Sequence, residues 1–130
     1  MGAWGSGSFE NDDAEDFLRD LQSKEIDDLG QILARATDQD YLGAPDSRVV
    51  VAAAEAIAML KGAPPQPVPS EIAEWASKVQ GAPTASLNEL ARRAVSTVRL
   101  NSELKDLWLE AEGLNEWSAS LRDLEQRLVQ

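Results

Sequence analysis

The strongest constraint on the fold is a run of apolar residues near the middle of the chain. Residues 49–60 read VVVAAAEAIAML, in which Glu55 is the one charged side chain. A helix that is apolar on nearly every side must be covered on every side, so this segment is predicted to lie at the centre of a helical bundle. Its alanines allow neighbouring helices to approach closely. The run is too short to span a bilayer, which takes about 20 residues.

Apolar stripes elsewhere in the chain predict the helices that surround this segment. Apolar residues recur every three or four positions, as on the buried face of an amphipathic helix. Trp75, Trp108 and Trp117 share these stripes, which places them in the core. No period-two run of β-branched residues appears, so no sheet is expected. Helix is predicted for about 70% of the chain, against roughly a third in an average protein. The predicted helices cover residues 11 or 12 to 21, 24–37, 46–61, 70–79, 86–100, 103–112 and 115–130.

Glycine, proline and polar residues mark the ends of these helices. Gly62 is expected to end the central helix, and residues 62–69 form a Pro-rich connector that cannot be helical. In the loop of residues 38–45, Tyr41 and Leu42 are expected to fold back onto the core. The predicted N-cap residues are Asp12, Ser70, and Asn101 or Ser102.

These patterns predict a single all-α domain over residues 1–130. It is one compact bundle of about seven helices, with an extended, ordered, Gly-rich N-terminal arm (residues 1–10) packed on it. The arm's glycines are expected to let its backbone run close to the bundle, while its aromatic residues insert into the core. The residues concerned are Gly2, Trp4, Gly5, Gly7 and Phe9.

The glycines of the arm do not form a nucleotide-binding loop. Their spacing, G-x-x-G-x-G, differs from the dinucleotide fingerprint G-x-G-x-x-G, and no strand precedes them. A helix N-terminus follows, which ordinarily suits an anion. Phosphate binding is disfavoured because carboxylates already occupy that position. They belong to Glu10, Asp12, Asp13, Glu15 and Asp16.

Negative charge is concentrated in the N-terminal part of the chain. Residues 9–46 contain 12 acidic and three basic residues, a net charge of −9, and residues 47–130 contain 11 and nine, a net charge of −2, which together make the −11 of the whole chain. Such a surface repels nucleic acid and anionic lipid, so neither is expected as a partner. It favours solubility, a basic protein partner or cations.

The residue types present exclude several kinds of chemistry. The chain has no cysteine and no histidine, which excludes disulfides, thiol nucleophiles, histidine bases and Cys/His zinc sites. We therefore assign no catalytic residue and no cofactor, and an enzyme is disfavoured. The N-terminus lacks the basic and apolar regions of a targeting segment, so a cytoplasmic protein is expected.

Four residues are candidates for a ligand site: Trp4, Asp12, Asp16 and Glu55. Asp12, Asp16 and Asp20 are spaced by four and lie on one helix face, where carboxylates would suit a hard cation. The segment does not have the pattern of an EF-hand loop, and acidic residues in a first helical turn are favoured by the helix dipole in any case. No metal is therefore predicted.

Glu55 is open to three interpretations. Buried alone, it would be costly and its pKa would rise, as in many active sites. Alternatively, it shares a stripe with Arg48, seven residues earlier, and reaches solvent beside Gly62. In the third interpretation it accepts hydrogen bonds from Trp4 or a backbone amide and anchors the N-terminal arm. The two structural interpretations are preferred.

The opening, MGAWGSGSFENDDAEDF, resembles the start of a family of small bacterial proteins, the domain of unknown function 4259. The segments at 52–60, 101–108 and 116–117 are also similar to the family. Phe17 stands where the family is expected to have tryptophan. The resemblance implies the fold and a bacterial origin, and the family has no established activity to carry over. The matching residues of the opening are Met1, Gly2, Trp4, Gly5, Gly7, Phe9, Asn11 and Asp12.

Two functions follow as hypotheses. The first is a non-enzymatic interaction module, similar to an immunity protein or antitoxin, that neutralises a basic partner through its acidic N-terminal half. The second is a domain that binds a small molecule or a cation, and possibly acts on it, with the arm and the carboxylates of Asp12, Asp16 and Glu55. The sequence does not indicate an oligomeric state.

Overall fold

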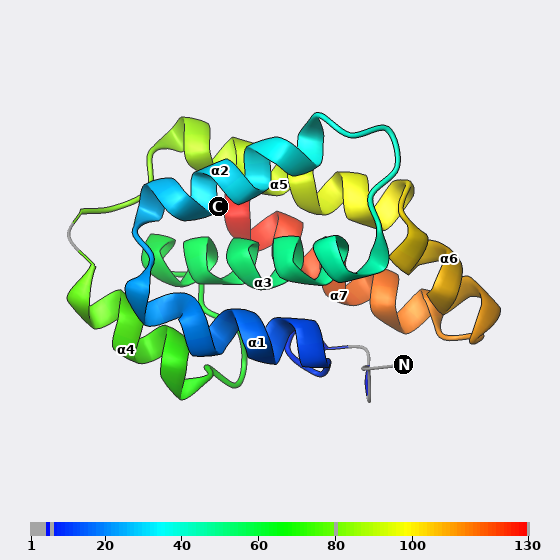
Figure 1. Ribbon diagram of the computed structural model, residues 1–130, viewed down its shortest axis with the longest axis horizontal. Helices are drawn as coiled ribbons and strands as arrows, with labels where there is room; N and C mark the ends of the chain where they lie inside the picture. The colour runs from blue at the N-terminus through cyan, green and yellow to red at the C-terminus, as the bar shows by residue number, and fades with distance from the viewer. Residues whose placement is uncertain (1–4, 6, 80, 130) are drawn as a thin grey trace.

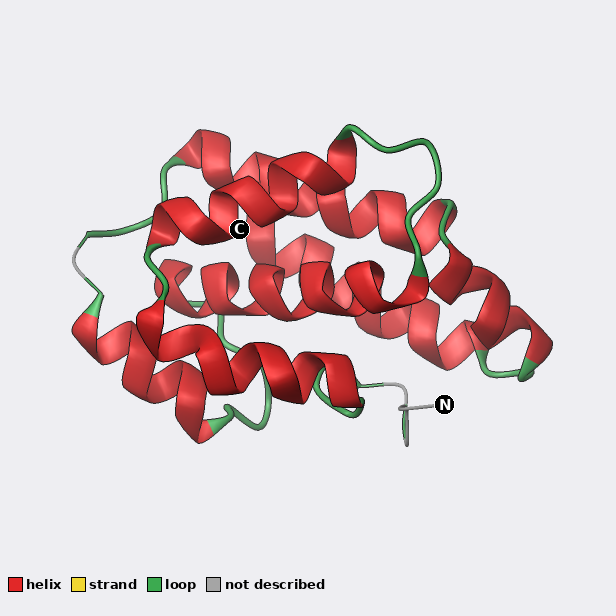
Figure 2. Ribbon diagram, viewed as in Figure 1, coloured by secondary structure: helices red, strands yellow, loops and turns green. Residues whose placement is uncertain are grey.

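Seven α-helices and one short 3-10 helix form the part of the chain that the structure describes. The computed structural model describes residues 5, 7–79 and 81–129. Of the described residues, 74% are helical, close to the predicted share. No strand occurs among the described residues (Figure 2). The elements are α1 (Asp12–Asp20), η1 (Leu21–Ser23), α2 (Ile26–Thr37), α3 (Ala44–Lys61), α4 (Ser70–Lys78), α5 (Ala85–Leu100), α6 (Glu103–Glu110) and α7 (Leu114–Val129).

Helix α3 runs through the middle of the bundle, as the sequence predicts. Figure 1 shows α1 and α4 on one side of it, α2 and α5 on the other, and α6 near one end. Each of the other six α-helices named above contacts α3. Of its 18 residues, 11 are buried. A segment that is apolar all round has thus been covered all round.

The surrounding helices each bury one apolar face against α3 or against one another. The buried apolar side chains form one cluster to which every α-helix contributes. Trp75 and Trp117 belong to it, and Trp108 packs against it half-buried. The Trp75 indole donates a hydrogen bond of 2.8 Å to the Lys24 carbonyl, which satisfies its polar atom in the core. Within the described chain, no helix has the length and apolarity needed to cross a membrane.

Several helix N-termini differ from the prediction by one or two residues. Asn11, not Asp12, caps α1, because its side-chain oxygen accepts a 2.7 Å hydrogen bond from the Ala14 amide. Helix α2 starts two residues later than predicted, since Glu25 and Asp28 form a capping box there.

Two further caps are decided by neighbouring residues. Ser70 is the first residue of α4 and does not cap it, because Pro69 occupies the cap position. Of the two candidates before α6, Ser102 is the cap, and its hydroxyl accepts a hydrogen bond from the Lys105 amide. Gly62 ends α3 in the left-handed conformation, with φ 96°, as predicted.

The described part of the N-terminal arm turns sharply before α1. The Glu10 amide donates to the Gly7 carbonyl, and the Gly7 amide donates 2.9 Å to the Glu10 carboxylate. A Cβ on Gly5 or Gly7 would lie 2.5 Å from that carboxylate. The nearest neighbour of both glycines is the side chain of Glu10. Both also line a small pocket with Val51 of α3 and Leu121 of α7, and their predicted role in close approach to the bundle stays a prediction. Phe9 packs half-buried against the core, as predicted. Met1, Gly2 and Trp4 lie outside the described residues.

The loop before α3 has one buried and one exposed residue. Leu42 is buried, as expected, and forms an isolated bridge with Ser102. Tyr41 is 51% exposed, so its predicted place on the core is wrong. The physical reason is its hydroxyl, which donates a hydrogen bond to the Asp106 carboxylate of α6 at the surface.

Candidate functional site

The three candidate site residues that the structure describes, Asp12, Asp16 and Glu55, do not come together. Trp4 is outside the described residues. Asp12 is exposed at the start of α1. Asp16 lines a cleft between α1, α2 and α3. Glu55 is buried inside α3 and faces α7 and the N-terminal arm through its hydrogen bonds. The structure therefore gives two separate places to consider.

The first place is the α1/α2/α3 cleft, which has a volume of about 420 Å³. Its apolar floor is made by Phe17 of α1, Ile32 of α2, and Val49 and Val50 of α3. Pockets of roughly 300–1,000 Å³ with an apolar lining and a few polar groups are typical of binding sites. The charged residues of its rim are Asp13, Asp16, Asp20, Lys24, Arg35 and Asp46.

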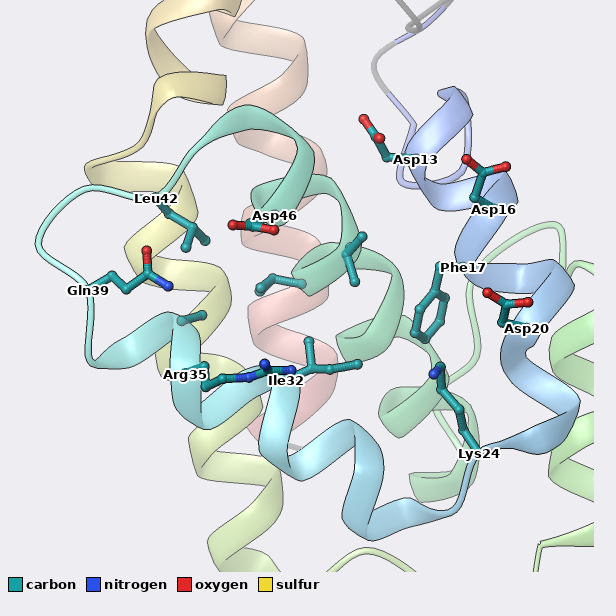
Figure 3. Close-up of a pocket in the computed structure, with 13 residues that line it drawn as sticks. Asp13, Asp16, Phe17, Asp20, Lys24, Ile32, Arg35, Gln39, Leu42 and Asp46 are labelled. Carbon is teal, nitrogen blue, oxygen red and sulfur yellow. The ribbon is translucent and has the colours of Figure 1, made fainter.

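The charges of the cleft are arranged by sign. In Figure 3 the carboxylates of Asp13, Asp16 and Asp46 lie along one edge, and Lys24 and Arg35 lie along the opposite edge. The carboxylate of Asp20 is the exception and lies next to Lys24. The first helical turn explains part of this pattern, since acidic residues stabilise the N-termini of α1 and α3. The repeat of α1 then places Asp16 and Asp20 on the same face of that helix as Asp13.

Two of the four carboxylates are already paired. Asp13 forms a 3.0 Å ion pair with Arg48, whose side chain is largely buried. Asp16 forms a 2.9 Å ion pair with the exposed Arg19. Asp20 and Asp46 have no cation within 4.0 Å among the described residues. Lys24 and Arg35 likewise have no carboxylate within 4.0 Å among the described residues.

The carboxylates of the cleft are not gathered into one cluster among the described residues. Over residues 5, 7–79 and 81–129, no group of three or more acidic side chains is close enough to hold a metal ion. The spacing of Asp12, Asp16 and Asp20 therefore does not become a cation cage in the fold. The sequence pattern missed Asp46, Lys24 and Arg35, because they reach this cleft from other elements.

The second place is a buried ion pair between Glu55 and Arg127 of α7. Arg127 donates to both Glu55 oxygens, at 2.8 and 3.2 Å, and to the Ala63 carbonyl at 3.2 Å. The Ser8 hydroxyl donates 2.6 Å to Glu55. Glu55 is 3% exposed. One carboxylate thus joins the N-terminal arm, the middle of α3 and the last helix.

The electrostatics of this pair are those of a satisfied structural contact. Burial lowers the pKa of Arg127, but hydrogen bonds and charge from Glu55, and then from Asp123, outweigh burial and raise it. The interpretation in which Glu55 reaches solvent is wrong. The anchoring of the arm is seen through the Ser8 hydroxyl, and Trp4, one of the expected donors, lies outside the described residues. Arg48 pairs with Asp13.

Arg127 was missed because 72 residues separate it from Glu55. A signal existed in the sequence. Arg127 stands next to Leu128 and three residues after Leu124, beside the apolar stripe of α7. A cation beside a buried stripe is a candidate partner for a carboxylate inside an apolar helix.

A wider groove lies between α2, α4 and α5, with a volume of about 1,000 Å³. Its lining is mainly apolar, with Ile26, Trp75, Leu87 and Leu90 among its residues. It contains none of the candidate site residues from the sequence, and it lies on the other side of α2 from the charged cleft.

Comparison with known proteins agrees with the resemblance of the opening segment. A family model, described as a domain of unknown function (DUF4259), matches residues 2–120 of the chain. The chain belongs to this family. No curated protein and no solved structure matches the chain. The family confirms the predicted relationship, and its description assigns no activity to any residue of the cleft or the buried pair.

Proposed function

We propose that this member of the DUF4259 family is a non-enzymatic interaction module that binds a basic protein partner through its N-terminal half. The concrete form is a neutraliser of a basic effector, similar in action to an immunity protein or an antitoxin. Complementary charge steers such partners together and contributes to specificity.

The observation that carries the proposal is the α1/α2/α3 cleft. It combines an apolar floor with carboxylates of two helices, in the part of the chain whose net charge is −9. Asp20 and Asp46 have no cation within 4.0 Å among the described residues, so a partner's basic side chain can supply one without displacing an internal ion pair. The buried pair of Glu55 and Arg127 supports the fold and takes no part in the binding.

Affinity capture with three forms of the protein tests the proposal. The first is the natural protein, and the second carries Asp16→Asn, Asp20→Asn and Asp46→Asn. The third is a control that removes the same charge from exposed residues far along the chain, with Glu110→Gln, Glu112→Gln and Glu116→Gln.

At low salt, the natural protein and the control are expected to capture a basic partner, and the cleft variant is expected not to capture it. High salt should abolish the capture by the natural protein and the control. Equal capture by the cleft variant and the natural protein would contradict a role for this cleft. Capture of no basic protein in any condition would refute the proposal as a whole.

The alternative, a small-molecule-binding domain, is favoured by one feature of the cleft, its volume of about 420 Å³. A thermal-shift screen with amino acids, amines and divalent cations tests it, because a ligand that binds the folded state raises the midpoint of unfolding. A shift that is lost in the cleft variant would support it, and the absence of any shift would refute it.

A further inference from the structure

The α1/α2/α3 cleft presents charges of both signs, and this narrows the chemistry of a partner. Its acidic edge is formed by α1 and the start of α3, and its basic edge by Lys24 and Arg35 (Figure 3). Phe17 and Ile32 make part of the apolar floor between them. The cleft is therefore not a uniformly acidic surface, although it lies in the most acidic part of the chain.

The charges that remain available are placed on both edges. Asp13 forms an ion pair with Arg48, and Asp16 forms an ion pair with Arg19. Asp20, Asp46, Lys24 and Arg35 have no oppositely charged group within 4.0 Å among the described residues. Figure 3 shows Asp46 across the cleft from Asp20, which lies on the side of Lys24. The opposite signs thus lie within one cleft without neutralising each other.

This arrangement of charges determines which kind of peptide segment can bind in the cleft. A long basic side chain has an aliphatic stem that covers apolar surface and a charged head that seeks carboxylates. A second basic residue beside it would approach Lys24 and Arg35, where like charges disfavour binding. An acidic residue in that place would be attracted instead.

We propose that the cleft binds a dipolar segment of a partner protein, in which a single Lys or Arg residue is separated by one residue from an acidic residue. The basic head faces Asp46 on the acidic edge, its stem covers the floor, and the acidic neighbour faces Lys24 and Arg35. This inference rests on the proposed function and refines it, because it excludes a polybasic run as the recognised element.

The test is an NMR titration of the isotope-labelled protein with short capped peptides. Two dipolar probes, acetyl-Arg-Leu-Glu-amide and acetyl-Glu-Leu-Arg-amide, cover both orders of the charges. The dibasic probe is acetyl-Arg-Leu-Arg-amide, and free L-arginine stands for a small molecule. The backbone amides of Asp20, Arg35 and Asp46 report binding in the cleft.

One dipolar peptide is expected to shift these amides and to bind several-fold more tightly than the dibasic peptide. Arg35→Glu should reverse that order, because it turns the basic edge acidic. The matched control is Arg93→Glu, which changes the same charge at an exposed position of α5 and should leave the order unchanged. Circular dichroism checks that both variants fold.

Tighter binding of the dibasic peptide to the natural protein would overturn the inference, since an undifferentiated acidic surface prefers more positive charge. So would an equal effect of the Arg35 and Arg93 variants, or binding of free L-arginine as tight as that of the dipolar peptides. These outcomes differ from a failure of the proposed function. A basic partner can be captured even if the dibasic peptide binds more tightly than the dipolar peptides. Conversely, a dipolar peptide can bind more tightly even if no basic partner is captured.

Discussion

At the scale of single residues, Glu55 shows how burial and pairing decide the role of a carboxylate. An isolated carboxylate in an apolar helix is a reasonable active-site candidate. Here both of its oxygens accept hydrogen bonds, from Arg127 and Ser8. The contact is therefore explained by the architecture, and it holds the N-terminal arm and α7 to α3.

Arg127→Met is expected to lower the free energy of unfolding by about 3–5 kcal/mol, because it leaves Glu55 buried without its cation. The double variant Glu55→Gln and Arg127→Met should recover a large part of that loss. Urea unfolding of both, with each single variant, gives the coupling energy. Arg122→Met, at an exposed position of α7, serves as the control. A loss below about 1 kcal/mol for Arg127→Met would contradict the assigned role.

Tyr41 offers a second test at this scale, because it is the single tyrosine of the chain. The hydrogen bond to Asp106, helped by the charges of Asp106, Glu103 and Glu110, raises its pKa from 10.0 to about 12. The folded state thus holds the phenol proton more tightly than the unfolded state. The resulting contribution to stability is present below pH 10 and is lost as the pH rises through 10 toward 12.

Asp106→Asn is expected to bring the pKa of Tyr41 back toward about 10. Tyrosinate absorbance, read after pH jumps and before the protein unfolds, measures it. Glu112→Gln, which removes a charge from an exposed turn after α6, is the control. An unchanged pKa in the Asp106 variant would show that the hydrogen bond is not its cause.

At the scale of elements, the junction between α6 and α7 depends on one small residue. A Cβ added to Gly113 would lie 2.7 and 2.9 Å from ring atoms of Trp108. The Trp108 ring packs half-buried on the core, so it has little freedom to move away. Gly113 therefore lets the ring close over the turn between α6 and α7.

Gly113→Ala is expected to destabilise the protein by about 1–3 kcal/mol through overpacking against Trp108. The comparison is Gly30→Ala inside α2, where the added Cβ would meet Leu87 at an ordinary 3.5 Å and helix propensity favours alanine. Thermal unfolding of the two variants measures the difference. Equal stability of both would show that the Trp108 contact does not constrain the turn.

At the scale of the whole molecule, charge is distributed unevenly around a continuous apolar core. The −9 of residues 9–46 is carried mostly by α1, α2 and the loops that flank them. These charges repel one another in the folded state, and salt screens such repulsion over about 10 Å at 0.1 M.

Raising NaCl from about 0.05 to 0.5 M is therefore expected to raise the midpoint of thermal unfolding. The triple variant with Asp16→Asn, Asp20→Asn and Asp46→Asn should show a smaller rise, because part of the repulsion is already removed. A fall of the midpoint with salt would mean that the ion pairs, such as Arg99 with Glu125, outweigh the repulsion.

The sequence by itself determined the helical class, the helix stripes and the central place of α3. These follow from spacing along the chain, and a 3.6-residue period or an apolar run acts locally whatever the rest of the fold does. Helix ends were less certain because caps depend on neighbours, as Asn11 and Ser70 show. The exposed position of Tyr41 was not predicted for a related reason, because its hydrogen-bond partner, Asp106, belongs to another helix.

Only the tertiary structure decided the two places of interest. Asp20, Arg35 and Asp46 share a cleft because α1, α2 and α3 pack side by side, and no local pattern relates those three helices in space. Likewise Glu55 meets Arg127 across 72 residues. Contacts of this kind depend on which helix faces pack against one another when the apolar stripes are buried, and the packing of the whole core determines those faces.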